Sequence, residues 1–268
     1  MTLFNLIILA IVQGITEFLP ISSSAHLVLL HEMRGVSGDD LALDVAVHLG
    51  SIAAVIVYFH TDALRALRGL GQVLRGRLNG AEAFLALALI IATIPAILLG
   101  AALVLTGWAE ALRDIRVIGW TMIVFGIALW WVHRIAPEAR QAGDWTLRHA
   151  LIMGLWQAIA LIPGVSRSGI TLTAARGLGY ARHGAARLAM LMSIPITLAT
   201  GALLARDVAQ AGVSPGFVTS AAIAAVVAFI AAYLALALMM RFLNRVSFTP
   251  YVIYRVILGI VLLVIAYA

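Results

Sequence analysis

Two polar stretches stand out in an otherwise apolar chain. The first, QGITEFLPISSSAHL, begins at Gln13 and holds a carboxylate, a histidine and three consecutive serines within fifteen residues. Gln13 and Glu17 are four residues apart and therefore share one face of a helix. Because a carboxylate within a membrane costs at least about 2.5–3.5 kcal/mol to insert, we expect Glu17 to be functional or paired. The alternative is a glutamate at the water interface with no role.

The serines of this stretch lie where a second helix should begin. Pro20 interrupts the first helix, and residues 22–24 are all serine. A serine at a helix start is usually a cap, which one of the three would satisfy. His26 follows within about one turn. A lone histidine is more often structural, but beside Glu17 and the serines a catalytic role for His26 is favoured.

The second stretch, PGVSRSGIT, runs from Pro163 to Thr171. Gly164 allows close approach of the backbone to a ligand, and the N–H groups that open the following helix point toward any bound anion. Arg167 adds a planar fork of donors that suits phosphate oxygens. An arginine at the cytoplasmic membrane surface with no ligand is the alternative. Hydroxyl donors in the same stretch are Ser166, Ser168 and Thr171.

Together the two stretches predict phosphoryl transfer to water or to a protein nucleophile, a reaction that needs positioning and charge stabilisation. We prefer attack by a serine hydroxyl of residues 22–24, with His26 or Glu17 as its base; attack by His26 or by water stays open. Glu17 could hold a divalent cation through oxygen ligands, with Mg²⁺ or Ca²⁺ as the natural choices. A membrane-embedded site predicts an amphiphilic substrate with a phosphate head and a long apolar tail.

Three further polar positions have weaker claims. Asp44 and His48, four residues apart, either line the mouth of the site or pair with arginines. Arg255, beside Tyr254, puts a charge well inside the last apolar segment and could be the counter-ion of a buried carboxylate.

The composition identifies an integral membrane protein. The 268 residues are 63% hydrophobic and 11% charged, with mean hydropathy +1.05, whereas a soluble domain is roughly 25% charged. The net charge of +6 comes entirely from arginine and shows no basic stripe with interleaved aromatics, so it does not indicate nucleic-acid binding. The absence of cysteine excludes disulfides and thiolate chemistry. The N-terminus lacks the features of a cleaved signal peptide and is expected to be retained.

The expected fold is all-α, with about six transmembrane helices. A span takes about 20 apolar residues, and six segments qualify: roughly 43–60, 82–106, 116–132, 184–205, 217–240 and 250–268. The connections at 60–80, 133–149, 176–187 and 241–248 hold most of the arginines, which places them in the cytoplasm by the positive-inside rule and both termini in the periplasm. Shorter, nearly neutral connections lie near 107–115 and 206–216.

The six spans cross the membrane in alternating directions only if residues 1–42 begin and end on the periplasmic side and residues 149–180 begin and end on the cytoplasmic side. Each segment must then enter the membrane and return as two short helices, with breaks at Pro20 and at Pro163-Gly164. The alternative for the first segment is that residues 1–19 simply span. Both breaks follow a glutamine and an apolar half-helix and precede a serine cluster. We therefore predict one membrane domain, 1–268, built from inverted repeats at about 1–132 and 149–268 with the site at their interface.

These motifs resemble a known family, the bacterial undecaprenyl-diphosphate phosphatases, also called bacitracin-resistance proteins. The resemblance rests on QGITEFLPISSSAHL, PGVSRSGITLTAARGLG, LMSIPI and SFTPYVIYRVILG, which occur in family order and cover essentially the whole chain. It implies an enzyme that removes the terminal phosphate of undecaprenyl diphosphate, which recycles the lipid carrier of peptidoglycan synthesis and confers bacitracin resistance. It also implies interleaved inverted repeats in the bacterial inner membrane and a site reached from the periplasm.

The resemblance assigns roles to individual residues. The acidic motif of the family falls on Gln13 and Glu17, the implied metal ligands, although many members carry Glu where this chain has Gln13. The catalytic positions fall on Glu17, Ser23, His26 and Arg167. The phosphate loop falls on Ser166, Arg167 and Thr171.

A transporter of a different class is the alternative function. Broken helices in an inverted repeat also build secondary transporters, and a phosphate cradle would suit a polyprenyl-phosphate flippase. A carrier needs an anion site but no nucleophile and base, so Glu17, Ser23 and His26 favour the enzyme. The sequence leaves the attacking group, the metal, the lipid chain length, flippase activity and a homodimer open.

Overall fold

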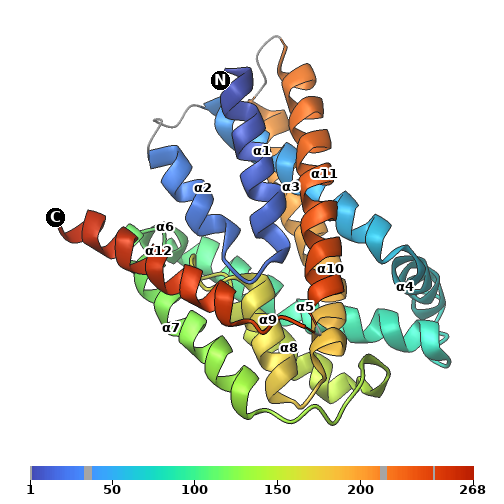
Figure 1. Ribbon diagram of the computed structural model, residues 1–268. Coiled ribbons are helices and arrows are strands. Elements are labelled where there is room, and N and C mark those ends of the chain that lie inside the picture. The colour runs from blue at the N-terminus through green and yellow to red at the C-terminus, as the bar shows by residue number, and fades with distance from the viewer. Residues whose placement is uncertain (1, 33–37, 212–215, 244) are drawn as a thin grey trace.

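The computed structural model describes residues 2–32, 38–211, 216–243 and 245–268, and within these ranges the chain is helical with no strand (Figure 1). An isolated bridge pairs Arg140 with Tyr180. The helices are α1 (Leu3–Phe18), α2 (Ser23–Glu32), α3 (Gly38–Tyr58), α4 (His60–Val73), α5 (Ala81–Thr106), α6 (Trp108–Ala111), α7 (Ile115–Ile135), the 3₁₀ turn η1 (Ala142–Asp144), α8 (Leu147–Ile159), α9 (Arg167–Gly177), α10 (Arg182–Ala211), α11 (Phe217–Phe242) and α12 (Thr249–Tyr267).

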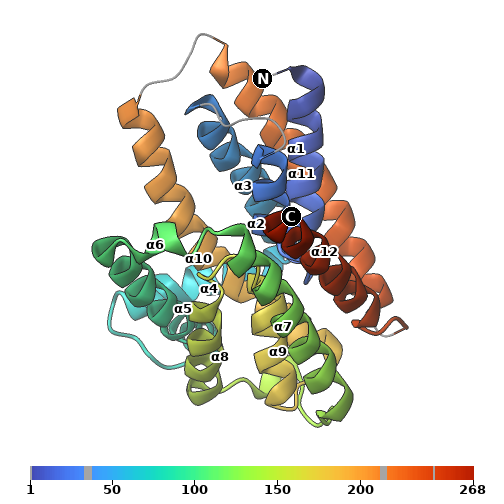
Figure 2. The ribbon, with the colours of Figure 1, turned by 90° about the vertical axis from the view of Figure 1, so that its left-hand side faces the viewer.

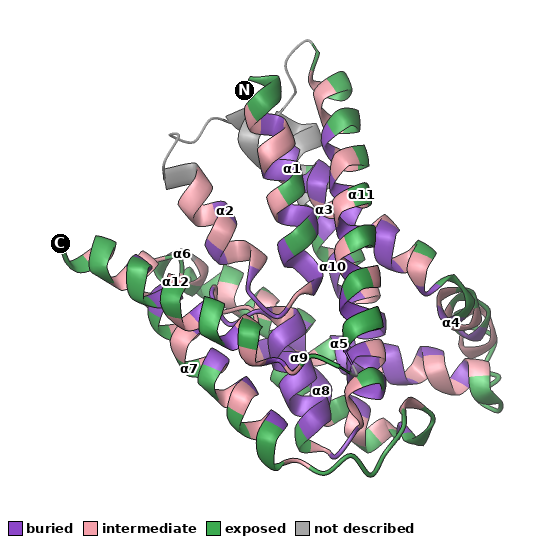
Figure 3. Ribbon diagram, in the orientation of Figure 1, coloured by how far each residue is buried: buried purple, intermediate pink, exposed green. Residues whose placement is uncertain are grey.

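Five of these helices, α5, α7, α10, α11 and α12, are long and apolar enough to cross a membrane. A sixth span comes from α3, whose apolar part, Leu43–Tyr58, meets α4 at a bend of 95°. Many large apolar side chains on their outer faces are exposed, as expected for surfaces that contact lipid (Figure 3). The prediction of an all-α, multi-pass membrane protein with about six spans is confirmed.

The two predicted breaks occur where proline and glycine placed them. α1 ends at Phe18 and α2 begins at Ser23, so the first break surrounds Pro20. The second lies between Ile159 and Arg167. At each break the chain reverses, and the two helices of each pair pack against each other as a hairpin, with α1 and α2 clearest in Figure 1 and α8 and α9 in Figure 2. That these hairpins are re-entrant in a bilayer stays a prediction.

Each hairpin packs against a long helix from the other half of the chain. α11 lies along α1, and α5 lies along α8. Small residues permit these close approaches: a Cβ on Gly14 would lie 2.6 Å from the carbonyl oxygen of Ala228, and one on Gly154 would lie 2.6 Å from that of Ala92. The halves therefore interleave, although their relation as inverted repeats at 1–132 and 149–268 stays a prediction.

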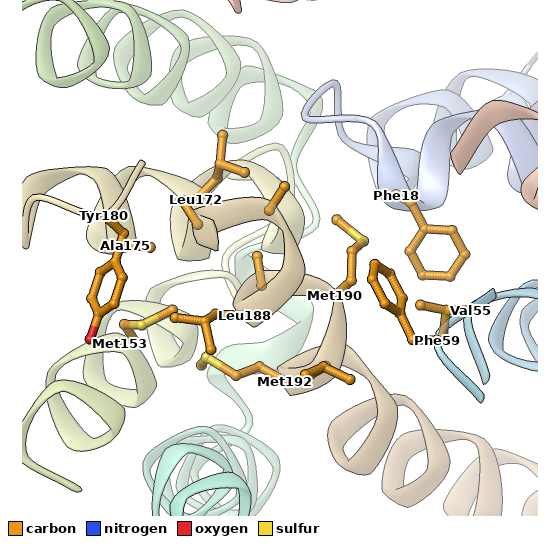
Figure 4. Packing of buried hydrophobic residues seen from close by; sticks show 14 of the residues in the cluster. Phe18, Val55, Phe59, Met153, Leu172, Ala175, Tyr180, Leu188, Met190 and Met192 are labelled. Carbon is orange, nitrogen blue, oxygen red and sulfur yellow. The ribbon is translucent and has the colours of Figure 1, made fainter. Parts of the chain in front are cut away.

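The main core is shared by both halves. Figure 4 shows Phe18, at the end of α1, close to Val55 of α3, to Phe59 at the bend between α3 and α4, and to Met190 of α10. The same cluster continues through α9, which is buried along almost all of its length (Figure 3). Because packed interiors resist displacement, this core fixes the two hairpin ends relative to one another.

The basic segments lie together but are not all loops. Residues 60–73 form helix α4, with Arg65 and Arg68 among exposed leucines, a pattern typical of an amphipathic helix at a membrane surface. Arg187 pairs bidentately with Asp62 (2.7 and 2.6 Å), and Arg182 binds Glu138 (3.1 Å), so three of the four basic segments meet at one face. In Figure 1 both termini and α6 lie toward the upper left and α4 toward the right.

The structure corrects the expected connections at 60–80 and 176–187, and part of the connection at 206–216 lies outside the described residues. The interpretation of 60–80 as a loop is wrong for most of its length, because a leucine repeat makes it helical. Arg176 is not a solvated loop charge: it is 1% exposed and donates to the carbonyl oxygens of Ala136 (3.0 Å) and Tyr180. The expected connection at 206–216 is helical to Ala211 and otherwise contains residues 212–215, outside the described ranges.

Candidate active site

The two hairpin breaks meet, and three hydrogen bonds join them. The amide of Gly164 donates to Ser24 Oγ (3.3 Å), and Ser168 Oγ donates to the carbonyl oxygen of Leu19 (2.9 Å). Arg167 Nη2 donates to Glu17 Oε1 at 2.6 Å. Residues about 150 positions apart in the chain thus lie together, at the place where the repeat argument puts the site.

Glu17 is the centre of this polar network. Its Oε2 accepts hydrogen bonds from Ser23 Oγ (2.7 Å) and from Gln13 Nε2 (2.9 Å), while Oε1 accepts from Arg167. The carboxylate is buried, and each of its oxygens has a donor, which is how a charged group is tolerated away from water. The short Ser23–Glu17 hydrogen bond points the hydroxyl proton of Ser23 toward a carboxylate that is able to accept it.

A cavity of about 190 Å³ opens beside the network. Ser23, Glu17 and Arg167 all line it, so a hydroxyl, a carboxylate and a guanidinium border one space that is large enough for a phosphate group. Its remaining lining residues are Ser22, Ser24, His48, Ala96, Gln157, Ala160, Leu161, Ser166, Ile196, Thr197 and Thr200.

The phosphate loop before α9 is shaped by an uncommon backbone conformation. Ser166 has φ +70° and caps the helix by accepting a hydrogen bond from the Gly169 amide (3.2 Å). Among the hydrogen bonds of the described residues, none is donated by the amides of Ser166, Arg167 or Ser168. The start of α9 therefore has N–H groups that are free to bind an anion, and two of the residues that carry them, Ser166 and Arg167, line the cavity.

The other predicted phosphate-loop residues hold the loop instead of lining the cavity. Ser168 bridges to Leu19, and Thr171 Oγ1 donates to the carbonyl oxygen of Arg167 (2.8 Å). Gly164, with φ +87°, packs against α7, where a Cβ would lie 2.2 Å from Thr121 Oγ1. Glycine is needed there for helix packing as well as for its backbone conformation.

The first hairpin repeats several of these features. Ser22 has φ +72°, and its hydroxyl lies 3.1 Å from that of Ser24, while the hydroxyls of Ser166 and Ser168 are 3.2 Å apart. A serine in the left-handed region is uncommon, so two of them at matching helix starts agree with the predicted repeat.

His26 does not line the cavity. Its Nδ1 is 2.7 Å from the carbonyl oxygen of Ser22 and must donate there, and its Nε2 lies 2.5 Å from the hydroxyl of Tyr254, with the rings stacked. Both nitrogens of His26 are thus occupied. This geometry gives His26 the position of a support for the Ser22 turn and separates it from the network around Glu17.

The imidazole that faces the network belongs to His48. Its Nδ1 is bound to the carbonyl oxygen of Asp44 (2.7 Å), and its Nε2 lies 3.9 Å from Glu17 Oε2. The sequence placed His48 as a candidate at the mouth of the site. Its position in the chain could not decide between His48 and His26, because the decision depends on how α3 packs beside α1.

Gln157 is a cavity residue that sequence reasoning did not assign. It is 2% exposed, donates through Nε2 to the carbonyl oxygen of Ala92 (3.2 Å), and its Oε1 has no hydrogen-bond partner. Gln157 precedes Ser166 by nine residues, as Gln13 precedes Ser22. This shared spacing of nine residues was the feature of the sequence that could have identified Gln157 as the counterpart of Gln13.

A preformed metal cluster is not present among the described residues, where no group of three His, Cys, Asp or Glu side chains comes together. The cavity does offer Glu17, and Oε1 of Gln13 is buried without a hydrogen-bond partner. Such a donor set fits a cation that takes most of its ligands from substrate phosphates and water, as Mg²⁺ commonly does.

Comparisons with known proteins agree over the whole chain. The family model described as bacitracin resistance protein BacA matches residues 6–261. A protein named undecaprenyl-diphosphatase from Dinoroseobacter shibae is 59% identical over 268 residues, and one from Ruegeria pomeroyi is 56% identical, each over the full length of both chains. A relative of the same name from Chromohalobacter salexigens is 44% identical over 261 residues, 97% of both chains. The chain therefore belongs to the bacitracin resistance protein BacA family.

Proposed function

We propose that this protein is an undecaprenyl-diphosphate phosphatase, which releases inorganic phosphate and returns undecaprenyl phosphate to peptidoglycan synthesis. The observation that carries the proposal is the contact of Ser23 and Arg167 with one buried carboxylate, Glu17, at a phosphate-sized cavity. Full-length relatives at 44–59% identity that are named for this activity support it. Removal of the terminal phosphate also accounts for bacitracin resistance, because it reduces the pool of the diphosphate lipid.

In the first step Ser23 attacks the terminal phosphorus. The Oγ–P bond forms as the bridging P–O bond breaks, undecaprenyl phosphate leaves, and the serine proton passes to Glu17 along the 2.7 Å hydrogen bond. Arg167 and the free amides of the α9 start stabilise the charge on the transferred phosphoryl group. Only one guanidinium nitrogen of Arg167 is occupied by Glu17, so other donors remain for phosphate oxygens.

In the second step water hydrolyses the phosphoserine. Glu17 passes its first proton to the departing undecaprenyl phosphate, and the carboxylate then accepts a proton from water as the water oxygen attacks phosphorus. The Oγ–P bond then breaks, Ser23 recovers its proton and inorganic phosphate leaves. His48, which faces the same carboxylate oxygen, is placed to assist the transfer; His26 supports the Ser22 turn.

The divalent cation, Mg²⁺ or Ca²⁺, would be held by the carboxylate of Glu17 and the side-chain amide oxygen Oε1 of Gln13. It would supply positive charge to the diphosphate when bound. If this is correct, Glu17→Gln abolishes both turnover and the response to either cation. A matched control is Asp114→Asn, because Asp114 is partly exposed, pairs with Arg116 and is not among the residues that line the cavity. Full cation-dependent turnover in Glu17→Gln would assign the cation to other ligands.

The protein is placed in the bacterial inner membrane with its cavity open to the periplasm. The basic face formed by α4 and its ion-pair partners supports this orientation through the positive-inside rule. His48 and Thr200 line the cavity from helices α3 and α10, both of which have their other ends at that basic face. A homodimer remains compatible with this arrangement.

The deciding experiment is phosphate release from undecaprenyl diphosphate by purified protein in detergent, with and without a chelator. We expect release that the chelator suppresses and that added Mg²⁺ or Ca²⁺ restores. A flippase would bind the lipid without releasing phosphate. The Ser23–Glu17 contact argues against a pure carrier, which has no need for a nucleophile beside a base.

A further inference from the structure

Three consecutive carbonyl groups of the phosphate loop are held by donors from outside the loop. The carbonyl oxygen of Pro163 accepts from Thr121 Oγ1 of α7 at 2.6 Å. Those of Gly164 and Val165 both accept from Nη2 of Arg255, on α12, at 3.0 and 2.8 Å. The peptide groups that carry these carbonyls also carry the amides of Gly164, Val165 and Ser166. The first two amides donate to Ser24 Oγ and to the carbonyl oxygen of Ile162, whereas among the described residues the Ser166 amide has no acceptor, and Ser166 lines the cavity.

The side chain that holds two of these carbonyls is itself unusual. Arg255 is 0% exposed, and its Nε and Nη1 have no hydrogen-bond partner among the residues that the structure describes. No ion pair joins it to a carboxylate among the residues that the structure describes, so the predicted role as a counter-ion has no support there. A buried charge without a counter-ion is costly. An anion bound on the other side of the loop would reduce that cost.

The packing around the guanidinium keeps it against the loop. A Cβ on Gly169, in the first turn of α9, would lie 2.8 Å from Nη1, so the absence of a side chain there makes room for the arginine. Gly126 of α7 does the same for the stem of Arg255, since a Cβ there would lie 3.4 Å from the arginine Cβ. Both glycines allow the charge to sit directly behind the anion-binding turn.

We propose that Arg255 is a positioning residue for the phosphate site: by holding the Val165 carbonyl it fixes the peptide group whose amide belongs to Ser166, so that this amide faces the bound phosphate, and its positive charge strengthens anion binding through the loop. The inference rests on the proposed function, since it assigns the cavity to a phosphate group. Arg167 contacts the phosphate directly in this scheme, whereas Arg255 acts through the backbone that Arg167 follows.

A second buried arginine provides a matched control. Arg176 is 1% exposed and also donates to backbone carbonyl oxygens, among them that of Ala136, but it does not line the cavity and the loop it organises is at the basic face. Both arginines should contribute to folding. Only Arg255 should affect affinity for phosphate.

The test compares wild type, Arg255→Met, Arg255→Lys and Arg176→Met in detergent. Two quantities are measured: the inhibition constant of inorganic phosphate against a short-chain polyprenyl diphosphate, and the rise in thermal unfolding midpoint that inorganic phosphate produces. Loss of a hydrogen bond to a charged group corresponds to about a tenfold change in affinity. We expect Arg255→Met to raise the inhibition constant about tenfold and to lose the phosphate-induced stabilisation. Arg176→Met should lower the midpoint and leave the inhibition constant within about twofold.

Should Arg255→Met not fold, Arg255→Lys decides, because lysine keeps the charge and can hold one carbonyl but not the fork. It should weaken phosphate binding more than Arg176→Met does. Wild-type phosphate binding in a folded Arg255 variant, or equal weakening in Arg255 and Arg176 variants, would overturn the proposal. The shift of the unfolding midpoint by inorganic phosphate does not depend on turnover. If phosphate stabilises the wild type but the wild type releases no phosphate from the lipid diphosphate, the proposed function is refuted. The midpoint shifts of the Arg255 and Arg176 variants then still test the role of Arg255.

Discussion

At the scale of single residues, the chemistry depends on what surrounds one carboxylate. Glu17 accepts hydrogen bonds from Ser23, Gln13 and Arg167, which come from two helix hairpins. In the unliganded protein the Arg167–Glu17 contact neutralises both charges. In the proposed mechanism, a diphosphate that enters the cavity competes for Arg167 and so frees the carboxylate to act as a base. Substrate binding and activation of the serine are thereby coupled.

Substitution of Arg167 by lysine tests this coupling. Arg167→Lys keeps the positive charge but cannot form the planar, two-pronged contact with phosphate. We expect a fall in kcat/KM of about 10- to 100-fold, the equivalent of one or two charge-assisted hydrogen bonds. The measurement is phosphate release under initial-rate conditions. Turnover close to wild type would mean that Arg167 serves as a topological anchor.

The attacking group can be identified by trapping the intermediate. Rapid mixing with labelled substrate followed by acid quenching should leave an acid-stable phosphate on Ser23, absent from Ser23→Ala. His48→Asn should slow its formation more than His26→Asn does, because only His48 lines the cavity. An acid-labile adduct that disappears in His26→Asn would contradict this assignment, and the absence of any adduct would indicate direct attack by water.

At the scale of elements, the site depends on how closely the hairpins approach their partner helices. Gly154 of α8 contacts the backbone of Ala92 on α5, and Gln157, one turn later, donates to the same carbonyl oxygen. The helix pair thus fixes the position of Gln157 in the cavity. A change in the spacing of α5 and α8 should affect both stability and activity.

Gly154→Ala is the corresponding test. The added Cβ would lie 2.6–2.9 Å from backbone atoms of Ala92, so the two helices must separate. We expect a loss of about 1–3 kcal/mol of stability, measured as a lower thermal unfolding midpoint in detergent. Gly100→Ala on α5 is the control, because its Cβ would meet only the Leu161 side chain at 3.7 Å. Equal midpoints for the two variants would show that α5 and α8 tolerate separation.

At the scale of the whole molecule, the distribution of charge sets the orientation. α4, the start of α10 and the connection after α7 are joined by the Asp62–Arg187 and Glu138–Arg182 ion pairs, so they share one face. The Glu138–Arg182 pair is largely exposed and contributes little stability, whereas the carboxylate of Asp62 is buried against Arg187. Both ion pairs hold the basic segments on one face of the molecule, which the positive-inside rule assigns to the cytoplasm.

Reporter fusions can check the orientation. A periplasm-active reporter fused after Ala268 should give signal, and the same reporter fused after Asn79, which follows α4, should give none. The paired fusions control for expression of the reporter. A cytoplasm-only signal at Ala268 would remove the basis for re-entrant hairpins.

The sequence by itself determined the fold class, the number of spans and the two breaks, because each follows from local physical chemistry: apolar length, proline and glycine. It also placed Glu17, Ser23 and Arg167 at those breaks. Membrane burial restricts where a carboxylate or guanidinium can lie, so these polar residues were conspicuous against an apolar background.

Only the tertiary structure decided which neighbours complete the site. His26 and His48 are both near Glu17 by sequence argument, but helix packing turns His26 toward Tyr254 and brings His48 beside the carboxylate. Arg255 lies 91 residues from the Gly164 carbonyl that it holds. Contacts of this kind depend on how α7, α9 and α12 pack, and neither periodicity nor spacing within one segment contains that information.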